Sequence, residues 1–203
     1  MRLSLAVIVL SAACAGCESW TGFGFRDDGP EMSRLKEVLA LESGKVVADV
    51  GAGKGELTLA LARQVGAKGH VFSTDIDPER VQRLREAVLA ARLDHVTVVP
   101  GHGSETGLPP GCCDAIVLRR VYHHLSDPRG INASLLRALR PGGLLAVIDF
   151  PPPFFASRGS LGVPADDVKL EVTRSGFVLL RVIDDWPGRG PLGVYCALFR
   201  KAP

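Results

Sequence analysis

The residues that most suggest chemistry surround a glycine-rich turn in VVADVGAGKGELTLALARQVG, residues 46–66. Gly51, Gly53 and Gly55 stand at every second position, between a predicted strand and a predicted helix. Glycine lets the backbone bend tightly and approach a ligand closely, because it has no Cβ. The carboxylate of Asp49 stands two residues before the first glycine. Such turns hold more than one kind of cofactor, so this motif predicts a ligand site without choosing the ligand.

A second carboxylate, Asp75, ends the next predicted strand in VFSTDIDPE, about 20 residues after Gly55, where an acid can accept hydrogen bonds from ribose hydroxyls. A dinucleotide would use the same features. The spacing G-x-G-x-G differs, however, from the G-x-G-x-x-G of dinucleotide sites. Asp49 would also repel phosphates at a helix N-terminus, which favours anions. A carboxylate there suits an ammonium or sulfonium, so the pattern favours a cationic nucleoside that carries an amino acid.

Tyr122, His123 and His124 follow the predicted strand 115–118 and are candidate catalytic residues. A histidine, with an unperturbed pKa of about 6.5, can remove the proton of a hydroxyl or amine acceptor. The alternative is structural: one histidine packs under the cofactor loop and the other faces solvent. A metal site is disfavoured, because neighbouring side chains usually diverge and no further ligands are evident.

Apolar segments alternate between strand and helix patterns along most of the chain, which predicts a parallel sheet covered on both faces. The last two strands follow one another without a helix, so one of them is expected to run antiparallel. The predicted helices are 31–41, 56–65, 78–91, 131–139 and 165–175, and the predicted strands are 46–50, 70–74, 96–99, 115–118, 144–149, 177–184 and 194–200.

These motifs together resemble the class I S-adenosylmethionine-dependent methyltransferases, in the small-molecule branch with a YHH-type segment after the fourth strand. The resemblance is carried by VVADVGAGKGELTLALA, VFSTDIDPERVQRLR, VTVVPGHGSETGLPPGCCDAIVLRRVYHHLSDP, LRALRPGGLLAVIDF, SGFVLLRVIDDW and YCALFRK, over roughly residues 31–201. It implies an α/β fold: a Rossmann-like, doubly wound, mostly parallel sheet of seven strands in the order 3-2-1-4-5-7-6, with a C-terminal antiparallel hairpin. It also implies a transferase that uses S-adenosyl-L-methionine to methylate an unidentified small-molecule acceptor.

The resemblance assigns cofactor-binding roles to matching positions. It implies that Asp49 faces the amino group of the methionyl part, while Asp75 holds the ribose and Ile76 packs on the adenine. Arg119 is implied to reach the methionyl carboxylate. The remaining positions are Gly51 and Gly53 along the methionyl part, Gly55 at the helix contact, and the adenine loop Gly101–Glu105 with Gly103, Ser104 and the acidic Glu105. His102 in this loop departs from the family pattern.

The chain of 203 residues with a net charge of +2 fits one main domain and shows no basic stripe, so no nucleic-acid partner is expected. Two other functions stay open: a domain that binds S-adenosylmethionine or S-adenosylhomocysteine without turnover, and a nucleotide-dependent oxidoreductase. The acceptor is not specified by the sequence. Phe154 and Phe155 after the fifth strand either line its site or only pack.

The N-terminus, MRLSLAVIVLSAACAGCESW, has Arg2 followed by an apolar run that is typical of a signal peptide and too short to span a bilayer comfortably. It resembles a bacterial lipoprotein signal with Cys17 as the lipidated residue and Cys14 as a second candidate. Residues 1–20 are therefore predicted to be a leader and residues 21–203 the methyltransferase domain.

A functional leader predicts a membrane-anchored or periplasmic protein, and an ordinary apolar leader or a misassigned start predicts a cytoplasmic one. S-adenosylmethionine is made in the cytoplasm, which favours binding without turnover if the protein is exported.

Three further cysteines, Cys112, Cys113 and Cys196, show no C-x-x-C spacing, so no metal site or thioredoxin-like motif is predicted. Adjacent cysteines rarely pair with each other, because the bridge would distort the peptide between them. Cys112 and Cys113 are interpreted as small residues at the start of a buried strand.

Overall fold

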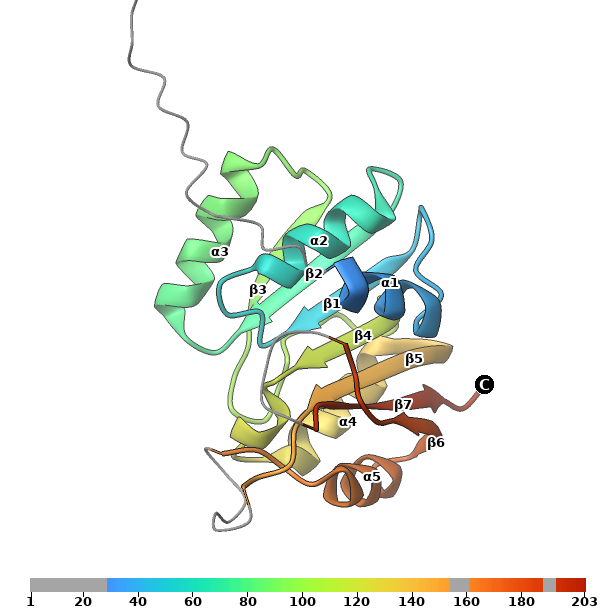
Figure 1. Cartoon of the computed structure of the whole chain (residues 1–203). Helices are drawn as coiled ribbons and strands as arrows, with labels where there is room; N and C mark the ends of the chain where they lie inside the picture. The colour runs from blue at the N-terminus through green and yellow to red at the C-terminus, as the bar shows by residue number, and fades with distance from the viewer. Residues whose placement is uncertain (1–28, 154–160, 188–192) are drawn as a thin grey trace, which may run out of the picture.

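The computed structural model describes residues 29–153, 161–187 and 193–203. Seven strands form one sheet in the order β3-β2-β1-β4-β5-β7-β6, which confirms the predicted fold (Figure 1). The strands are β1 (Val46–Val50), β2 (His70–Asp75), β3 (Val96–Pro100), β4 (Cys113–Arg119), β5 (Leu139–Asp149), β6 (Phe177–Ile183) and β7 (Tyr195–Lys201).

Strands β1 to β5 pair in parallel, whereas β7 lies antiparallel between β5 and β6. The carboxyl ends of the first five strands therefore meet at one edge of the sheet. In open α/β sheets this edge binds ligands where the strand order reverses. Here that point lies between β1 and β4, which continue along the chain into Gly51 and Arg120.

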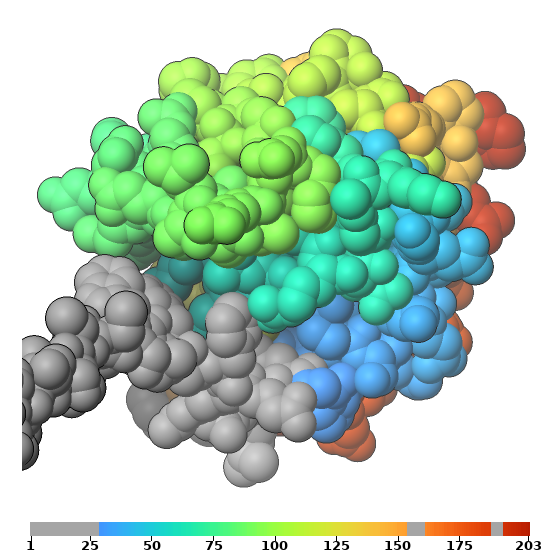
Figure 2. Space-filling model, turned by 90° about the horizontal axis from the view of Figure 1, so that it is seen from above, coloured from blue at the N-terminus to red at the C-terminus, as the bar shows by residue number. Residues whose placement is uncertain are grey.

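Helices cover both faces of the sheet. Three lie on one face, α1 (Gly29–Val38), α2 (Glu56–Val65) and α3 (Pro78–Ala90), and two on the other, α4 (Pro128–Ala138) and α5 (Ala165–Arg174) (Figure 1). Figure 2 shows the first face, with α3, α2 and α1 next to one another. The two-sided cover explains why the central strands β1 and β4 are mostly apolar, since most of their side chains are buried.

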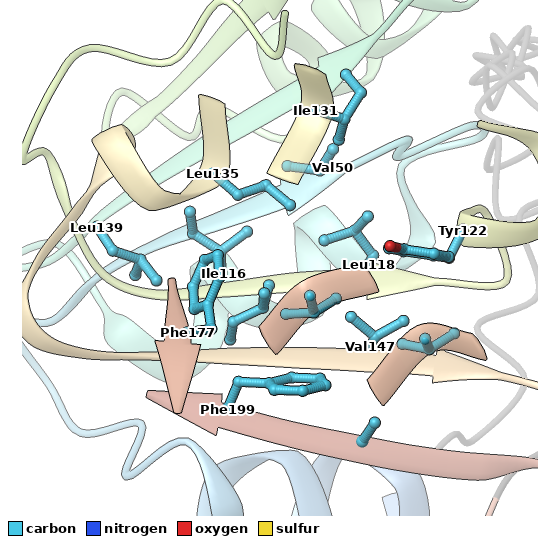
Figure 3. Packing of buried hydrophobic residues seen from close by; sticks show 14 of the residues in the cluster. Val50, Ile116, Leu118, Tyr122, Ile131, Leu135, Leu139, Val147, Phe177 and Phe199 are labelled. Carbon is cyan, nitrogen blue, oxygen red and sulfur yellow. The ribbon is translucent and has the colours of Figure 1, made fainter. Parts of the chain in front are cut away.

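Each face of the sheet has its own hydrophobic cluster. Ile116 and Leu118 of β4 point towards α4 and α5, where Leu135 and Phe199 join them (Figure 3). Val117, between them in sequence, packs with the residues of α1 and α2 on the other face. Burying one such side chain contributes roughly 1.5–3 kcal/mol. The alternation fixes the register of β4 and thereby the position of the residues that follow it.

The helix predicted at 131–139 begins and ends earlier in the structure. It starts at Pro128, because the Asp127 carboxylate accepts the Gly130 N–H at 2.9 Å and caps the first turn. It ends at Ala138, and Leu139 already pairs with Cys113. Strand β5 therefore begins five residues before the predicted strand 144–149 and includes the segment Pro-Gly-Gly, with a register shift between Cys113 and Ala115.

Several predictions fall outside the described residues: the leader at residues 1–20, with Cys14 and Cys17, and the wall residues Phe154 and Phe155. In the part of the chain that the structure describes, no helix is long and apolar enough to cross a membrane. No group of three or more His, Cys, Asp or Glu residues there could hold a metal ion.

Candidate active site

A cavity of about 240 Å³ opens at the carboxyl edge of the sheet, where the glycine turn, the end of β2 and the segment after β4 come together. Five of the predicted site residues line it, and they come from segments far apart in sequence. Its walls are formed by Val50, Gly51, Thr74, Asp75, Ile76, Arg80, Gly101, His102, Glu105, Thr106, Val121, His124, Leu125 and Ile131.

The glycine turn has a left-handed backbone at every second residue, with φ values of +75° at Gly51, +56° at Gly53 and +80° at Gly55. A Cβ on Gly51 would overlap the side chain of Val121. A Cβ on Gly53 would meet no atom within 4 Å. Gly51 therefore permits close packing against the segment after β4, whereas Gly53 borders open space into which a ligand can fit.

Asp75 is almost fully buried, and backbone donors hold its carboxylate in place. Gly53 N–H donates to Oδ2 at 2.9 Å and Asp77 N–H to Oδ1 at 3.1 Å, while Arg80 Nη1 lies 3.9 Å from Oδ2. Ile76, the next residue, keeps 69% of its surface exposed and lines the cavity. An oriented carboxylate beside an exposed apolar side chain fits a ribose with a base stacked next to it.

Asp49 is buried and does not line the cavity. Thr58 Oγ1 donates to its Oδ2 at 2.7 Å, and Thr58 in turn lies 2.8 Å from Ser73 Oγ. Burial raises the pKa of Asp49 to about 6, opposed by the Thr58 hydrogen bond and the charge of Arg119. A nearby cation stabilises the ionised form of such a buried carboxyl. This agrees with the expected contact between Asp49 and an ammonium group.

The predicted adenine loop forms a tight turn closed by His102 and Glu105, whose backbones exchange hydrogen bonds of 2.7 and 3.2 Å. Both residues line the cavity, whereas Gly103 and Ser104 at the tip of the turn are exposed and do not. Arg137 Nη2 donates to Glu105 Oε1 at 2.6 Å and thereby lowers the pKa of Glu105.

Arg119 is placed on the α1 side of the sheet rather than at the cavity. Its Nη1 donates to Glu31 Oε2 at 3.0 Å, and Trp186 Nε1 donates to Glu31 Oε1 at 3.2 Å. Glu31 is almost fully buried. The carboxylate that Arg119 binds here is therefore that of Glu31, and its expected contact with a methionyl carboxylate stays a prediction. Sequence reasoning did not single out Glu31 or Trp186.

The two histidines lie in a short 3-10 helix, Tyr122–His124, and have different surroundings. His123 is buried, with Nδ1 2.8 Å from Asp149 Oδ1, and its backbone N–H donates to Asp149 Oδ2 at 3.2 Å. Burial raises the pKa of Asp149, and the charge of His123 opposes this shift. Asp149, at the end of β5, was not among the predicted site residues.

His124 is exposed and lines the cavity, with its ring centroid 3.9 Å from that of His123. Desolvation and the neighbouring His123 lower its pKa below the ordinary value. His124 is therefore neutral at pH 7 and can accept a proton. One histidine is thus buried and paired with Asp149, and the other lines the cavity; a catalytic role for either stays a prediction.

Tyr122, the third catalytic candidate, lies in the hydrophobic core and not at the cavity (Figure 3). Its hydroxyl accepts from Asn132 Nδ2 at 2.8 Å and donates to Glu171 Oε2 at 3.1 Å. These contacts attach the 3-10 helix to α4 and α5. Tyr122 thus helps to hold the 3-10 helix that contains the two histidines in place.

Comparisons with known proteins agree with this geometry. A family model described as a methyltransferase domain matches residues 48–147. A ubiquinone/menaquinone biosynthesis C-methyltransferase of Vibrio vulnificus is 31% identical over 116 residues, which are 55% of this chain and 44% of that protein. A protein-L-isoaspartate O-methyltransferase of Ignicoccus hospitalis is 31% identical over 128 residues, 62% of this chain and 57% of that one. The chain thus spans about half the length of these curated relatives.

Among solved structures, a SAM-dependent methyltransferase from Aquifex aeolicus matches with a TM-score of 0.75 and 24% identity, over 87% of this chain and 93% of that chain. This likeness concerns the fold. Together, the domain match, the strand order and the glycine turn with its two carboxylates decide the family. The chain belongs to the class I S-adenosylmethionine-dependent methyltransferases.

Proposed function

We propose that the protein transfers the methyl group of S-adenosylmethionine to a small-molecule acceptor. One observation carries this proposal: a single cavity is lined both by the nucleoside-type residues Asp75 and Ile76 and by His124. The similarity to a quinone methyltransferase supports an acceptor of small size. The two relatives carry names with different acceptors, so neither acceptor is transferred to this chain.

The residues present fit the methyl donor. Asp75 would accept hydrogen bonds from the ribose hydroxyls, Ile76 would pack on the adenine, and the open space beside Gly53 would admit the methionyl part. Asp49, buried behind the Thr58 hydrogen bond, would supply negative charge towards the ammonium. When bound, the donor supplies a methyl group that its sulfonium has already made electrophilic.

The protein's own part in the reaction is to align the acceptor, exclude water and remove a proton. His124 can remove the proton of an acceptor hydroxyl or amine, because its lowered pKa keeps the imidazole neutral near pH 7. His123 does not line the cavity; its bond to Asp149 fixes the 3-10 helix that presents His124. His124 is thus the proposed base, and His123 and Tyr122 are positioning residues.

Calorimetric titration with S-adenosylmethionine, S-adenosylhomocysteine and NAD tests the cofactor. We expect saturable binding of both sulfur nucleosides and none of NAD. Asp75→Ala should weaken binding by roughly 1.5–3 kcal/mol, about tenfold or more, because it removes charged acceptors for two hydroxyls. Asp94→Ala, in the exposed turn after α3, is the matched control and should bind like the wild type. Binding of NAD but of neither sulfur nucleoside would overturn the proposal in favour of an oxidoreductase.

Turnover separates an enzyme from a domain that only binds the nucleoside. Transfer of radiolabelled methyl groups from S-adenosylmethionine to quinols, catechols, amines and thiols would be measured with wild type and His124→Gln. Transfer that requires His124 supports the proposed base. Saturable binding with no transfer to any acceptor class would favour the binding domain.

We also propose that residues 1–20 act as an export or anchoring leader, with Cys17 as the lipidated residue. The apolar run after Arg2 and the small residues before Cys17 support this. Mass spectrometry of the native N-terminus tests it, together with fractionation of cells into membrane, periplasm and cytoplasm. An unprocessed Met1 on a cytoplasmic protein would contradict it and leave the cytoplasmic alternative.

A further inference from the structure

We propose that Arg120 binds an anionic group of the methyl acceptor, so that the acceptor is a small molecule that carries a carboxylate or a phosphate. This inference rests on the proposed function and narrows its substrate class. It rests on three features of Arg120: its position after β4, its left-handed backbone, and its buried Nε without a hydrogen-bond partner. The sequence motifs give this residue no role.

Arg120 adjoins the candidate active site in the chain, although it is not itself one of the residues that line the cavity. It directly follows β4 and precedes Val121, which lines the cavity and packs against Gly51. Its backbone N–H donates to Ile148 O of β5 at 2.7 Å. The glycine turn is instead tied to β2, since Gly51 N–H and Ala52 N–H both donate to Thr74 O. Arg120 is therefore attached to the β4–β5 side and the nucleoside-type residues to the β1–β2 side.

The backbone of Arg120 is left-handed, with φ of +57°. Residues other than glycine rarely adopt this conformation. Where they do, the surrounding structure imposes it, and such residues gather at binding and active sites. Among the described non-glycine residues with positive φ, Arg120 directly precedes a lining residue, Val121, whereas Ala40, Arg92 and Asp185 have no neighbour in the cavity lining. The left-handed residue next to the cavity is thus Arg120.

The Nε of Arg120 is buried and forms no hydrogen bond in the described part of the chain. Three acids described above have other partners: Glu31 pairs with Arg119, Asp149 with His123, and Glu105 with Arg137. A buried charged donor without an acceptor costs free energy, which an incoming anion would recover. The planar fork of a guanidinium matches a carboxylate or phosphate with two parallel hydrogen bonds.

The carboxylate could come from two sources, the acceptor or the methionyl end of the donor. The attachment of Arg120 to β5 rather than to the glycine turn favours the acceptor. A donor carboxylate would lie beside Gly51 and Gly53, on the β1 side of Arg120. The experiment therefore separates binding of the donor from binding of a second anion.

Arginine labelling of the full chain with phenylglyoxal, mapped by mass spectrometry, tests the proposal. We expect Arg120 to react at least fivefold faster than Arg119, which Glu31 engages. With S-adenosylhomocysteine at saturation, benzoate or inorganic phosphate should slow the reaction of Arg120 at least threefold, whereas neutral benzamide should not. The exposed Arg85 on α3 is the control and should react at the same rate throughout.

Binding of S-adenosylhomocysteine to Arg120→Gln identifies the source. An affinity within twofold of wild type supports the acceptor. A loss of tenfold or more, with 5′-methylthioadenosine bound as by wild type, would assign Arg120 to the donor carboxylate and overturn the acceptor assignment. An Arg120 that does not react, or that no anion protects, would overturn the anion site itself. Wild-type binding of S-adenosylhomocysteine, measured separately, shows whether the proposed function has failed instead.

Discussion

The two sides of the cavity are built in different ways. On the nucleoside side, the glycine turn and Asp75 are held mainly by backbone hydrogen bonds between residues close in sequence, such as Gly53 N–H to Asp75. On the acceptor side, side chains join segments that lie farther apart: Tyr122 donates to Glu171 across 49 residues, and His123 contacts Asp149 across 26. The nucleoside side can therefore be recognised as a motif, whereas the acceptor side exists only once the chain has folded.

The largest expected effect tests the acceptor side alone. His124→Gln should lower kcat for a hydroxyl or amine acceptor by about 10²- to 10⁴-fold, while the affinity for S-adenosylhomocysteine stays within about threefold, because only the base is lost. The wild-type rate should rise with pH through a pKa below about 6.5 and stay level above it. Steady-state kinetics between pH 5 and 8 measure both. An unchanged kcat would show that alignment alone suffices.

The contact between the two sides is tested next. Gly51→Ala should destabilise the fold by roughly 2–4 kcal/mol, because it adds left-handed strain and places a Cβ 2.9 Å from Val121 Cβ. Gly142→Ala is a matched control: its φ is +74° and its Cβ would meet open space. It should cost about 1 kcal/mol from strain alone. Urea unfolding gives both values, and equal costs would mean that Val121 moves aside easily.

Replacing Asp49 should raise the stability of the fold at neutral pH, whereas replacing Gly51 should lower it. The folded-state pKa of Asp49, about 6, lies above the ordinary value of 3.8 for an aspartic acid, so the folded protein holds this proton more tightly than the unfolded chain. This carboxyl therefore favours folding below pH 4, and its contribution is lost as pH rises through about 6. Asp49→Asn should raise stability relative to wild type by about 1–3 kcal/mol at pH 7.5 and by nothing at pH 3.5.

Chemical denaturation at the two pH values measures this difference, with Asp94→Asn as the exposed control. The same variant should bind S-adenosylmethionine more weakly at pH 7.5, because the negative charge is gone. A variant that is less stable at pH 7.5 would show that Thr58 and Ser73 compensate the buried charge fully.

The smallest expected effects are those of removing the helix caps of α3 and α4, and they too distinguish the two sides of the cavity. Asp77 caps α3 after β2, and Asp127 caps α4 after the 3-10 helix. Replacing either with Ala should cost about 1 kcal/mol of stability. Only Asp77→Ala should also weaken nucleoside binding, since the lost cap loosens the start of α3, where the backbone N–H of residue 77 donates to Asp75. Thermal unfolding and calorimetry on both variants decide this, and equal effects on binding would contradict the division.

The sequence predicted the fold and the nucleoside side because their signals are local. Apolar runs, the glycine spacing and the acid ending β2 all lie within short segments, and strand β1 was predicted to the residue. The limits of α4 and β5 were missed, because the pairing of Leu139 with Cys113 outweighs the local breaker Pro-Gly-Gly.

The acceptor side was less predictable, since burial and pairing decide its roles. Sequence could not tell that Tyr122 enters the core or that His123 binds Asp149, nor, away from the cavity, that Glu31 engages Arg119. An acid ending β5, directly before the apolar Phe150, was the one signal that could have singled out Asp149.

The place of β7 between β5 and β6 also governs when the protein can fold. Strand β5 ends at Asp149, but its outer neighbour, Tyr195–Lys201, is synthesised only after α5 and β6. Until then β5 has an open apolar edge, which is prone to pair with other chains. The sheet therefore cannot be completed before the segment that follows β6 has been made. A chain that stops after Gly193 should aggregate during expression rather than yield a smaller folded domain.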